Sequence, residues 1–501
     1  MSSPLSQPTL SPSVVQPLGL FEDHADVGPV RLPGSCTYDA ARQEYRITGA
    51  GTNMWLAYDE FHLTYRRMTG DFILSARCRF LGDGVDLHRK LGWIVRAALT
   101  PDAAYVSAAV HGGDGLTSLQ FRRTPGALTD EVRSPLVGPD MIQLERKGET
   151  YTMSVAHFGQ EFSSVSVADI AGLGDTVYVG LFVTSHNADV VEEAVFTNVR
   201  VTVPSPETLV PYREYLGSCL EMLDVESGQR EAIYTETGCF EAPNWTPDGA
   251  ALIYNRAGGL YRFPLDTRTP ERIDTGDAEG LNNDHVLSFD GTQIGISYRS
   301  PDPGQGGKSI ISVLPVGGGT PRRVTPLAPS YLHGWSPDGE TLLYTAERGD
   351  GNYDIYSIPT QGGTETRLTT APGLDDGSEY TPDGNFIYFN SERSGRMQIW
   401  RMRPDGSAQE QVTDDKFNNW FPHVSPDGKQ IAFLSYNGDI PSNQHPYYKP
   451  VYLRLINIEG GTPKVIAYTY GGQGTINVPS WSPDSKKLAF VSNSGPLPEI
   501  V

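Results

Sequence analysis

The sequence predicts an all-β protein of two domains, and three observations lead to this prediction. The chain has 501 residues, which is longer than one ordinary domain. Glycine (54), proline (38) and tyrosine (25) are abundant, which favours short strands joined by tight turns over long helices. The pattern also changes near residue 203, because strands without a repeat precede this point and a repeated turn motif follows it. The expected order is a disordered lead-in (1–17), a first domain (18–203), a linker (204–215) and a second domain (216–501).

The composition limits the partners and the location of the protein. Its net charge of −21 argues against nucleic acid and anionic membranes as partners, since both attract clusters of Lys and Arg. No apolar run approaches the roughly 18 residues of a membrane span, so no membrane insertion is expected. The first residues lack the basic and apolar regions of a signal peptide. We therefore expect a cytoplasmic protein, or a periplasmic or secreted one if a signal peptide was removed; the oligomeric state stays open.

The first domain shows many strand-length segments without helical periodicity. FILSARCRFLG, LGWIVRAAL, DMIQLERKG and TVYVGLFVTS alternate or run apolar, and turn residues separate them. Many antiparallel strands of this kind predict a β-sandwich. In strand order this half resembles the concanavalin A-like jelly-roll superfamily, which implies carbohydrate binding or cleavage. It lacks the acidic ExDxxE spacing of that superfamily's glucanases, and its six histidines are dispersed along the sequence, so we expect an accessory domain.

The second domain contains six copies of one turn motif. Each copy precedes an apolar strand, and most units continue with two further strands, which predicts four-stranded propeller blades. The copies are NWTPDG (244–249), LSFDG (287–291), WSPDG (335–339), YTPDG (380–384), VSPDG (424–428) and WSPDS (481–485). The segments 217–234 and 486–493 each supply part of a blade, so we expect them to pair and close a six-bladed ring. These repeats resemble the TolB-like six-bladed propellers over residues 210–501, a fold that serves binding proteins and enzymes alike.

The residues ahead of the turn motif differ from those that a turn needs. In SPDG the proline, aspartate and glycine fix the turn itself. The segment NNWFPHV (418–424) precedes one such turn, and the equivalent segments of other blades also carry polar side chains. These segments lead into the innermost strands at the mouth of the central channel. The predicted catalytic residues are His285, His333, His423, Glu379, Asp375 and Asp376.

Three of the four propeller histidines precede a turn motif, and the fourth, His445, lies in the longest loop between a second and a third strand. Imidazoles with carboxylates suit two chemistries, acid–base catalysis and binding of a divalent metal such as calcium, manganese or zinc. The metal hypothesis uses His285, His333, His423 and Gln473. Alternatively, these side chains only tie neighbouring blades together. The predicted substrate-binding residues are Asn418, Asn419, Trp420, Gln473, Asn477, Tyr331, His445, Arg299, Arg348 and Arg393.

The combination of residue types favours a carbohydrate-active enzyme, a lyase or a hydrolase, with an oligosaccharide substrate. In residue type and position it resembles the propeller-fold polysaccharide lyases, although no motif of theirs is present from which a residue's role can be transferred. The alternative is a non-catalytic TolB-like propeller that binds a glycan or a protein partner. Serine hydrolases and nucleotide enzymes are disfavoured, since the sequence has no nucleophile elbow, P-loop or dinucleotide fingerprint.

Overall fold

The fold is described here for residues 18–500 of a computed structural model. Within this range strands form almost all of the regular structure, and the helices are two single-turn 3-10 segments, η1 (Ala171–Leu173) and η2 (Pro303–Gln305). The all-β prediction is therefore confirmed. The predicted lead-in, residues 1–17, lies outside the described residues. No helix in the described range is long and apolar enough to cross a membrane.

The chain folds into two compact units. The first extends to His157 and also includes Phe162–Val201 and the chain from Pro498 onward. The second consists of Phe158–Glu161 and Thr202–Leu497. The stretch predicted as a linker, 204–215, contains turns but no strand.

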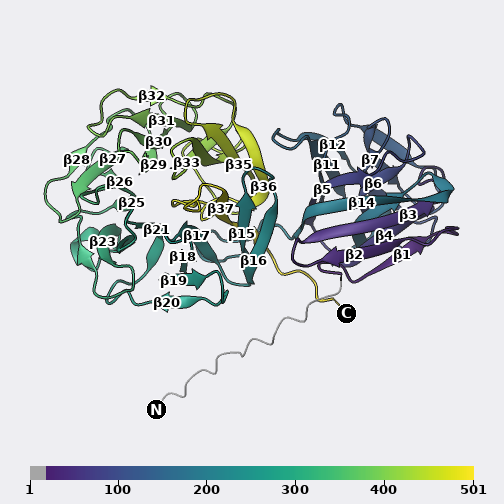
Figure 1. The fold of residues 1–501 in the computed structure, drawn as a ribbon, viewed down its shortest axis with the longest axis horizontal. Helices are drawn as coiled ribbons and strands as arrows, with labels where there is room; N and C mark the ends of the chain where they lie inside the picture. The colour runs from purple at the N-terminus through teal and green to yellow at the C-terminus, as the bar shows by residue number, and fades with distance from the viewer. Residues whose placement is uncertain (1–17, 501) are drawn as a thin grey trace, which may run out of the picture. The chain divides into compact units, whose positions relative to one another are not determined.

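The first unit contains two seven-stranded antiparallel sheets (Figure 1). In sheet order the first comprises β1 (Asp23–Val27), β4 (Phe61–Thr69), β13 (Thr176–Thr184), β6 (Lys90–Arg96), β7 (Tyr105–His111), β8 (Thr117–Arg122) and β9 (Asp130–Arg133). The second comprises β12 (Ser163–Val167), β11 (Thr150–Ala156), β10 (Met141–Lys147), β5 (Phe72–Leu81), β14 (Asn187–Thr202), β3 (Glu44–Gly51) and β2 (Ser35–Asp39). Strand β3 contacts β4 and β13, and β5 and β10 contact β6. This arrangement fits a sandwich, while the concanavalin A-like assignment stays a prediction.

The central strands of the first sheet are buried along their whole length. Every residue of β6, β7 and β8 is buried, which explains why LGWIV reads as a continuous apolar run. Two arginines on these strands nevertheless have no exposed surface. Arg96 Nη1 and Arg122 Nη2 each donate to the carboxylate of Asp59 at 2.7 Å. A buried charge requires such a partner, so Asp59 fixes its loop over the sheet.

The second unit is a ring of six blades (Figure 1). The first blade consists of β17 (Phe240–Trp245), β18 (Ala251–Arg256), β19 (Gly259–Pro264) and β20 (Glu271–Ile273). The second consists of β21 (Leu281–Leu287), β22 (Gln293–Arg299), β23 (Ser309–Pro315) and β24 (Arg322–Arg323). The third consists of β25 (Ser330–Trp335), β26 (Thr341–Glu347), β27 (Tyr353–Pro359) and β28 (Thr366–Arg367). The fourth blade consists of β29 (Asp375–Tyr380), β30 (Ile387–Ser391), β31 (Gln398–Met402) and β32 (Glu410–Gln411). The fifth consists of β33 (Asn418–Val424), β34 (Gln430–Tyr436), β35 (Lys449–Asn457) and β36 (Lys464–Gly471). The six-bladed propeller is therefore confirmed.

The sixth blade is built from both ends of the propeller sequence. Strands β15 (Gly217–Asp224) and β16 (Arg230–Glu236) join β37 (Lys487–Ser494) in one sheet. The register pairs Leu220 with Val491 and continues over the whole of β15. The innermost strand of this blade is reduced to a single bridge between Trp481 and Leu488. The predicted pairing of 217–234 with 486–493 is confirmed.

The turn motif has the structural role that the sequence predicts. In the WSPDG copy, Ser336 Oγ donates to Asp338 Oδ1, and that oxygen also accepts the backbone N–H of Glu340. Gly339 has a φ of +73°, which the closing position of the turn requires. The other five copies have the same hydroxyl-to-carboxylate hydrogen bond. The motif thus fixes how each innermost strand passes to the second strand.

Candidate functional site along the propeller channel

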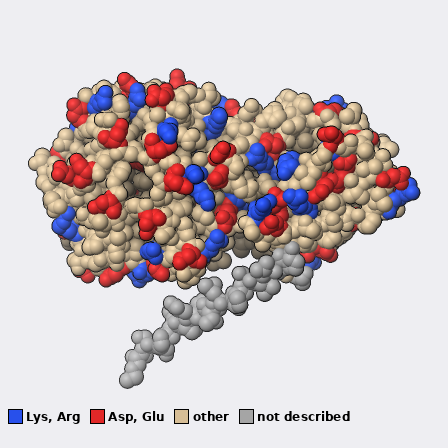
Figure 2. Space-filling model, viewed as in Figure 1, with Lys and Arg blue, Asp and Glu red and all other residues tan. Residues whose placement is uncertain are grey.

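The innermost strands of five blades, β17, β21, β25, β29 and β33, line the central channel (Figure 1). Figure 2 shows a hollow at the centre of the ring, with acidic side chains spread around it. Each of these strands is interrupted by a bulge against its neighbour in the blade. Ala242, Gly377 and Phe421, each four residues before the Ser or Thr of its turn motif, have positive φ values of 55–63°. A bulge re-aims the side chains beside it, so the strands present polar groups to the channel.

One end of the channel holds two buried carboxyl groups, those of Asp284 and Asp376, together with His333. His333 Nε2 lies 2.8 Å from Asp376 Oδ1, and Thr345 Oγ1 donates to the same oxygen at 2.7 Å. Burial alone would raise the pKa of Asp376, but the charge and hydrogen bond of His333 bring it down to about 2. Burial raises the pKa of Asp284 to about 7, and the nearby charges of Asp376 and Glu241 add to this effect. Two carboxyl groups of the same site thus differ strongly in acidity.

The surroundings of His333 raise the pKa of its imidazole. Burial would lower its pKa, but the negative charge of Asp376 and, to a smaller degree, of Asp284 raises the pKa above the ordinary value. Its ring is stacked against Phe421, with the ring centres 6.2 Å apart. The second ring nitrogen, Nδ1, is buried and makes no hydrogen bond. Among residues 18–500 this nitrogen therefore has no partner, and a proton on it would be free for a ligand.

A rim of further polar groups surrounds this end of the channel. The ring of His445 packs edge-on against Trp420, at 4.5 Å between ring centres, and burial lowers its pKa. His445 Nδ1 and Gln473 Oε1 are both buried and make no hydrogen bond within the described part of the chain. Tyr331 lies near Asp284 and Asp376, and burial together with these charges raises its pKa to about 12.

Glu241 extends this rim from the first blade. Its carboxylate accepts hydrogen bonds from the Tyr447 hydroxyl at 2.8 Å and from the Cys239 thiol at 3.2 Å. Burial raises the pKa of Glu241. The rim therefore combines side chains from at least four blades.

Glu379 and His423 form a second polar pair farther along the channel. Their Oε2 and Nδ1 atoms lie 2.7 Å apart, and the backbone N–H of Val424 donates to the other carboxylate oxygen at 3.1 Å. His423 Nε2 also contacts the Ile476 carbonyl oxygen. These contacts connect blades four, five and six.

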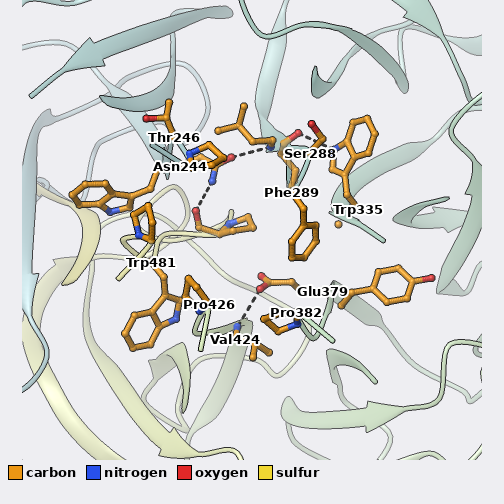
Figure 3. Close-up of a pocket in the computed structure, with 18 residues that line it drawn as sticks. Asn244, Thr246, Ser288, Phe289, Trp335, Glu379, Pro382, Val424, Pro426 and Trp481 are labelled. Atoms are coloured by element: carbon orange, nitrogen blue, oxygen red, sulfur yellow. Dashed lines mark hydrogen bonds between the residues drawn. The ribbon is translucent and has the colours of Figure 1, made fainter. Parts of the chain in front are cut away.

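A cavity of about 240 Å³ opens beside this pair, at the end of the channel where the turn motifs lie. All six blades line it, with Asn244, Ser288, Trp335, Glu379, Val424 and Trp481 among the contributors. Figure 3 shows Glu379 bonded to Val424, with Trp335 and Trp481 on opposite sides of the open space. Four prolines of the turn motifs complete the wall, so the cavity is mainly apolar around one carboxylate.

The structure does not bring the three predicted histidines together. His285 is buried, and its Nε2 lies 3.2 Å from the Ile253 carbonyl oxygen, whereas His333 contacts Asp376 and His423 contacts Glu379. Burial lowers the pKa of His285 to about 4, so it stays neutral. Within the described part of the propeller no three His, Cys, Asp or Glu side chains place donor atoms within 4.8 Å of one another. The metal role of His285, His333, His423 and Gln473 stays a prediction.

Several predicted residues are directed to structural partners. Asp375 binds Arg393 at 2.7 Å, and Arg348 binds Glu365 at 2.7 Å. Trp420 is fully buried, so it offers no open face for a sugar ring to stack on. The remaining predicted residues divide between buried hydrogen-bonded amides, Asn418, Asn419 and Asn477, and the exposed Arg299. The fixed contacts of the three asparagines leave them little freedom to bind a ligand.

Two residues of the channel were missed at the level of the sequence. Asp284 directly precedes the predicted His285, and strand alternation makes only one of two neighbours face the channel. The bulge between Leu281 and His285 breaks that alternation, so Asp284 also belongs to the polar cluster. Glu241 stands five residues before Thr246, as Asp376 stands five before Thr381. A comparison of the repeats position by position would have indicated Glu241.

The histidines of the first domain correct an expectation from the sequence. They are not dispersed in the folded protein: His88, His111 and His186 lie near one another, and His24 lies beside His62. The strands of the sheet bring together residues that are far apart in the chain.

The fold and the channel define the class of the protein, a six-bladed β-propeller joined to a separate β-rich domain. A family model described as the TolB beta propeller domain matches residues 327–446. The uncharacterized protein Atu1656 of Agrobacterium fabrum is 46% identical over 275 residues, which are 55% of this chain and 92% of that protein. The chain therefore belongs to the TolB-like β-propeller family.

Two further relatives carry the TolB name. A solved structure from Agrobacterium tumefaciens, named as a candidate TolB, is 44% identical, with a TM-score of 0.53, and the match covers 56% of this chain and 99% of that one. The Tol-Pal system protein TolB of Francisella tularensis is 24% identical over 281 residues, which are 54% of this chain and 61% of that protein.

Proposed function

We propose that the propeller is a carbohydrate-active enzyme, a lyase or a hydrolase, that cleaves oligosaccharides by acid–base catalysis at the channel end around Asp284, His333 and Asp376. One observation carries the proposal: His333 and Asp376 form a buried pair at 2.8 Å with the buried Asp284 nearby, and burial raises the pKa of Asp284 to about 7 whereas His333 brings that of Asp376 down to about 2. Such a separation is typical of sites that divide the roles of acid and base between neighbouring groups. It supports catalysis more than mere contact between blades.

The proposed roles follow from these acidities. Asp376 stays ionised, raises the pKa of His333 and fixes the orientation of its ring. In its protonated form His333 donates a proton from Nδ1 to the leaving oxygen of the sugar, and Asp284 in its ionised form accepts a proton from the substrate or from water. His445, Gln473 and Tyr331 supply hydrogen bonds to hydroxyl groups at the rim. The predicted role of Asp375 is not retained in this proposal, since Arg393 occupies its carboxylate.

The test is turnover of a panel of oligosaccharides that includes uronate-containing ones. An unsaturated product indicates a lyase, whereas new reducing ends without unsaturation indicate a hydrolase. We expect Asp284→Asn and His333→Gln to lower kcat by roughly a hundredfold or more. Asp277→Asn, which changes an exposed carboxylate in the loop that leads into the same blade, is the matched control and should keep full activity. The proposal fails if the wild-type protein cleaves none of the panel or if Asp284→Asn is fully active.

The cavity at the opposite end of the channel favours a second candidate function, binding of a glycan or a protein without catalysis. Its tryptophans and prolines suit an apolar side chain or the apolar face of a sugar. Phe289 at its edge is 43% exposed and can be changed without opening the core. If the protein retains immobilised oligosaccharides or a protein partner without turnover, and Phe289→Ser abolishes this retention, the binding function is preferred.

A further inference from the structure

One end of the first sheet carries a group of histidines and carboxylates outside the propeller. His111 is the last residue of β7, and His88 lies two residues before β6, its neighbour in the sheet (Figure 1). Asp114 lies in the loop from β7 to β8. Because β6, β7 and β8 are adjacent antiparallel strands, the start of one lies beside the end of the next. The three side chains therefore meet at one end of these strands although the sequence separates them.

The donor atoms of these three side chains face one another. His88 Nδ1 lies 3.4 Å from His111 Nδ1, His111 Nδ1 lies 3.3 Å from Asp114 Oδ1, and His88 Nδ1 lies 3.7 Å from Asp114 Oδ2. The buried His111 makes no hydrogen bond through Nε2, so its polar contacts run through Nδ1. Lone pairs that converge in this way repel one another unless a cation lies among them. A single proton can join only one pair of these atoms.

The spacing matches one metal geometry. In a tetrahedral site two ligand atoms are separated by about 1.6 times the bond length, so zinc bonds of about 2.0–2.1 Å require roughly 3.3 Å between donors. Calcium and magnesium take oxygen ligands and select against imidazole. We propose that His88, His111 and Asp114 bind a divalent transition metal ion of the zinc type through two imidazole Nδ1 atoms and a carboxylate oxygen.

The loops that carry the donors are held in place. The backbone N–H groups of Gly112 and Gly113 donate to the carbonyl oxygens of Arg89 and Leu87 at 2.8 and 3.1 Å. A Cβ atom at Gly113 would come within 2.4 Å of the Leu87 backbone, so only glycine permits this approach. Arg89 is itself fixed by a buried pair with Glu192 at 2.6 Å. The two donor loops are thus clamped together before any metal binds.

A third histidine lies beside the proposed site. The ring of His186 is 5.5 Å from that of His88, and its Nδ1 is 3.3 Å from Asp86 Oδ1. His186 has a φ of +58°, an unfavourable conformation for a residue other than glycine. Asp86 also accepts the backbone N–H of His88 at 2.8 Å, so it links the two histidines. His88 and Asp114 are exposed, which leaves solvent access to the fourth position of the metal.

The experiment measures zinc binding to the full chain. The protein is stripped with a chelator and dialysed against Zn²⁺, and bound metal is counted by elemental analysis. His88→Gln and Asp114→Asn change exposed residues, so the fold should survive. We expect each to weaken zinc binding by roughly tenfold or more. In the wild type, Co²⁺ in place of Zn²⁺ should show the visible absorption of tetrahedral cobalt, and both variants should lose this absorption.

Two matched variants control for other histidines. His24→Gln removes a histidine paired with His62 in the same domain, where the two nitrogens of His62 contact different partners. His333→Gln removes the histidine that pairs with Asp376 in the propeller. Both control variants should bind as much zinc as the wild type, whereas His88→Gln should bind less. The proposal is overturned if the wild type binds no zinc, or if His88→Gln and Asp114→Asn bind as much as the wild type, which would mean adventitious binding elsewhere.

Discussion

Glu379 and His423 show how one side chain can serve both a site and the fold. Each is less than one-tenth exposed, and together they connect neighbouring blades beside the cavity. The sequence left two readings open for such residues, a catalytic site and a tie between blades. The contacts of His423 with Glu379 and with the Ile476 carbonyl favour the tie for this histidine.

The first prediction concerns the stability that this pair provides. His423→Ala should lower the free energy of unfolding by about 3–5 kcal/mol, because it leaves the buried carboxylate of Glu379 without its partner. In the double variant His423→Ala/Glu379→Ala that charge is gone, so the further loss should be small or reversed. Denaturant unfolding of all four proteins gives the coupling energy. An unchanged unfolding midpoint in His423→Ala would contradict the structural role.

The second prediction concerns the dependence of stability on pH. The pKa of Asp284 is about 7 in the folded protein, against an ordinary value of about 4, so between these values only the folded state keeps the proton. This stabilisation is complete below about pH 4 and is lost as the pH rises through 7. Asp376, with a pKa of about 2, remains ionised throughout this range.

Comparison with Asp284→Asn reports this effect, because the variant lacks the titrating carboxyl group. The wild type should lose on the order of 4 kcal/mol relative to the variant between pH 4 and pH 7. Unfolding in denaturant at several pH values measures the difference. Parallel pH profiles for the two proteins would show that Asp284 does not retain its proton.

At the residue scale the sequence predicted the types of side chain along the channel better than their partners. His333, His423 and Asp376 were recognised because they precede a turn motif. Their partners depend on how neighbouring blades are aligned, and one sequence carries no information on that alignment. Asp284 was missed because the bulge between Leu281 and His285 breaks the strand alternation, although it lies next to a predicted histidine.

The innermost strands shape the channel, and those of five blades each contain a bulge. In blade four, Gly377 has a φ of +63°, and a Cβ atom there would come within 2.5 Å of Asn390 Oδ1. That oxygen accepts the backbone N–H of Phe421 from the next blade at 2.9 Å. The glycine thus permits a hydrogen bond between blades at the level where the polar side chains begin.

The third prediction tests this element. Gly377→Ala should cost about 3 kcal/mol, since it combines backbone strain with displacement of Asn390. Gly395→Ala is the matched control, because Gly395 also has a positive φ (+93°) but open space around its α-carbon, so about 1 kcal/mol is expected there. Thermal unfolding of both variants compares them. Equal losses of stability in the two variants would mean that the bulge does not require glycine at position 377.

At the element scale the turns were predictable and the bulges were not. A turn is fixed by four consecutive residues, and SPDG contains them all. A bulge depends on the register of two strands, and Ala242, Gly377 and Phe421 share the same backbone state without sharing a residue type. The period of two therefore misassigned which neighbours face the channel.

The whole propeller depends on one sheet that joins its two ends. β37 pairs with β15 along the whole of that strand, and β15 carries β16 at its other edge. The sequence predicted this closure because its two incomplete units complement each other.

The fourth prediction tests the closure. A chain that ends after Lys486 lacks β37 and leaves β15 with an unpaired edge, so it should aggregate. A chain that ends after Gly495 keeps β37 and should remain soluble, which makes it the matched control. Size-exclusion chromatography with light scattering separates the outcomes. A soluble monomer with a native circular dichroism spectrum after the shorter truncation would argue against closure by β37.

The same closure has a consequence for synthesis on the ribosome. The partner of β15 is made only after the other five blades, which at typical translation rates takes roughly fifteen to fifty seconds. Throughout this time the nascent ring is open, and the edge that β37 will cover is available to other strands. During this period, binding of a chaperone to the open ring or the rate of translation could determine the yield of folded protein. Two chains emerging from neighbouring ribosomes could exchange their last strands and form a linked dimer.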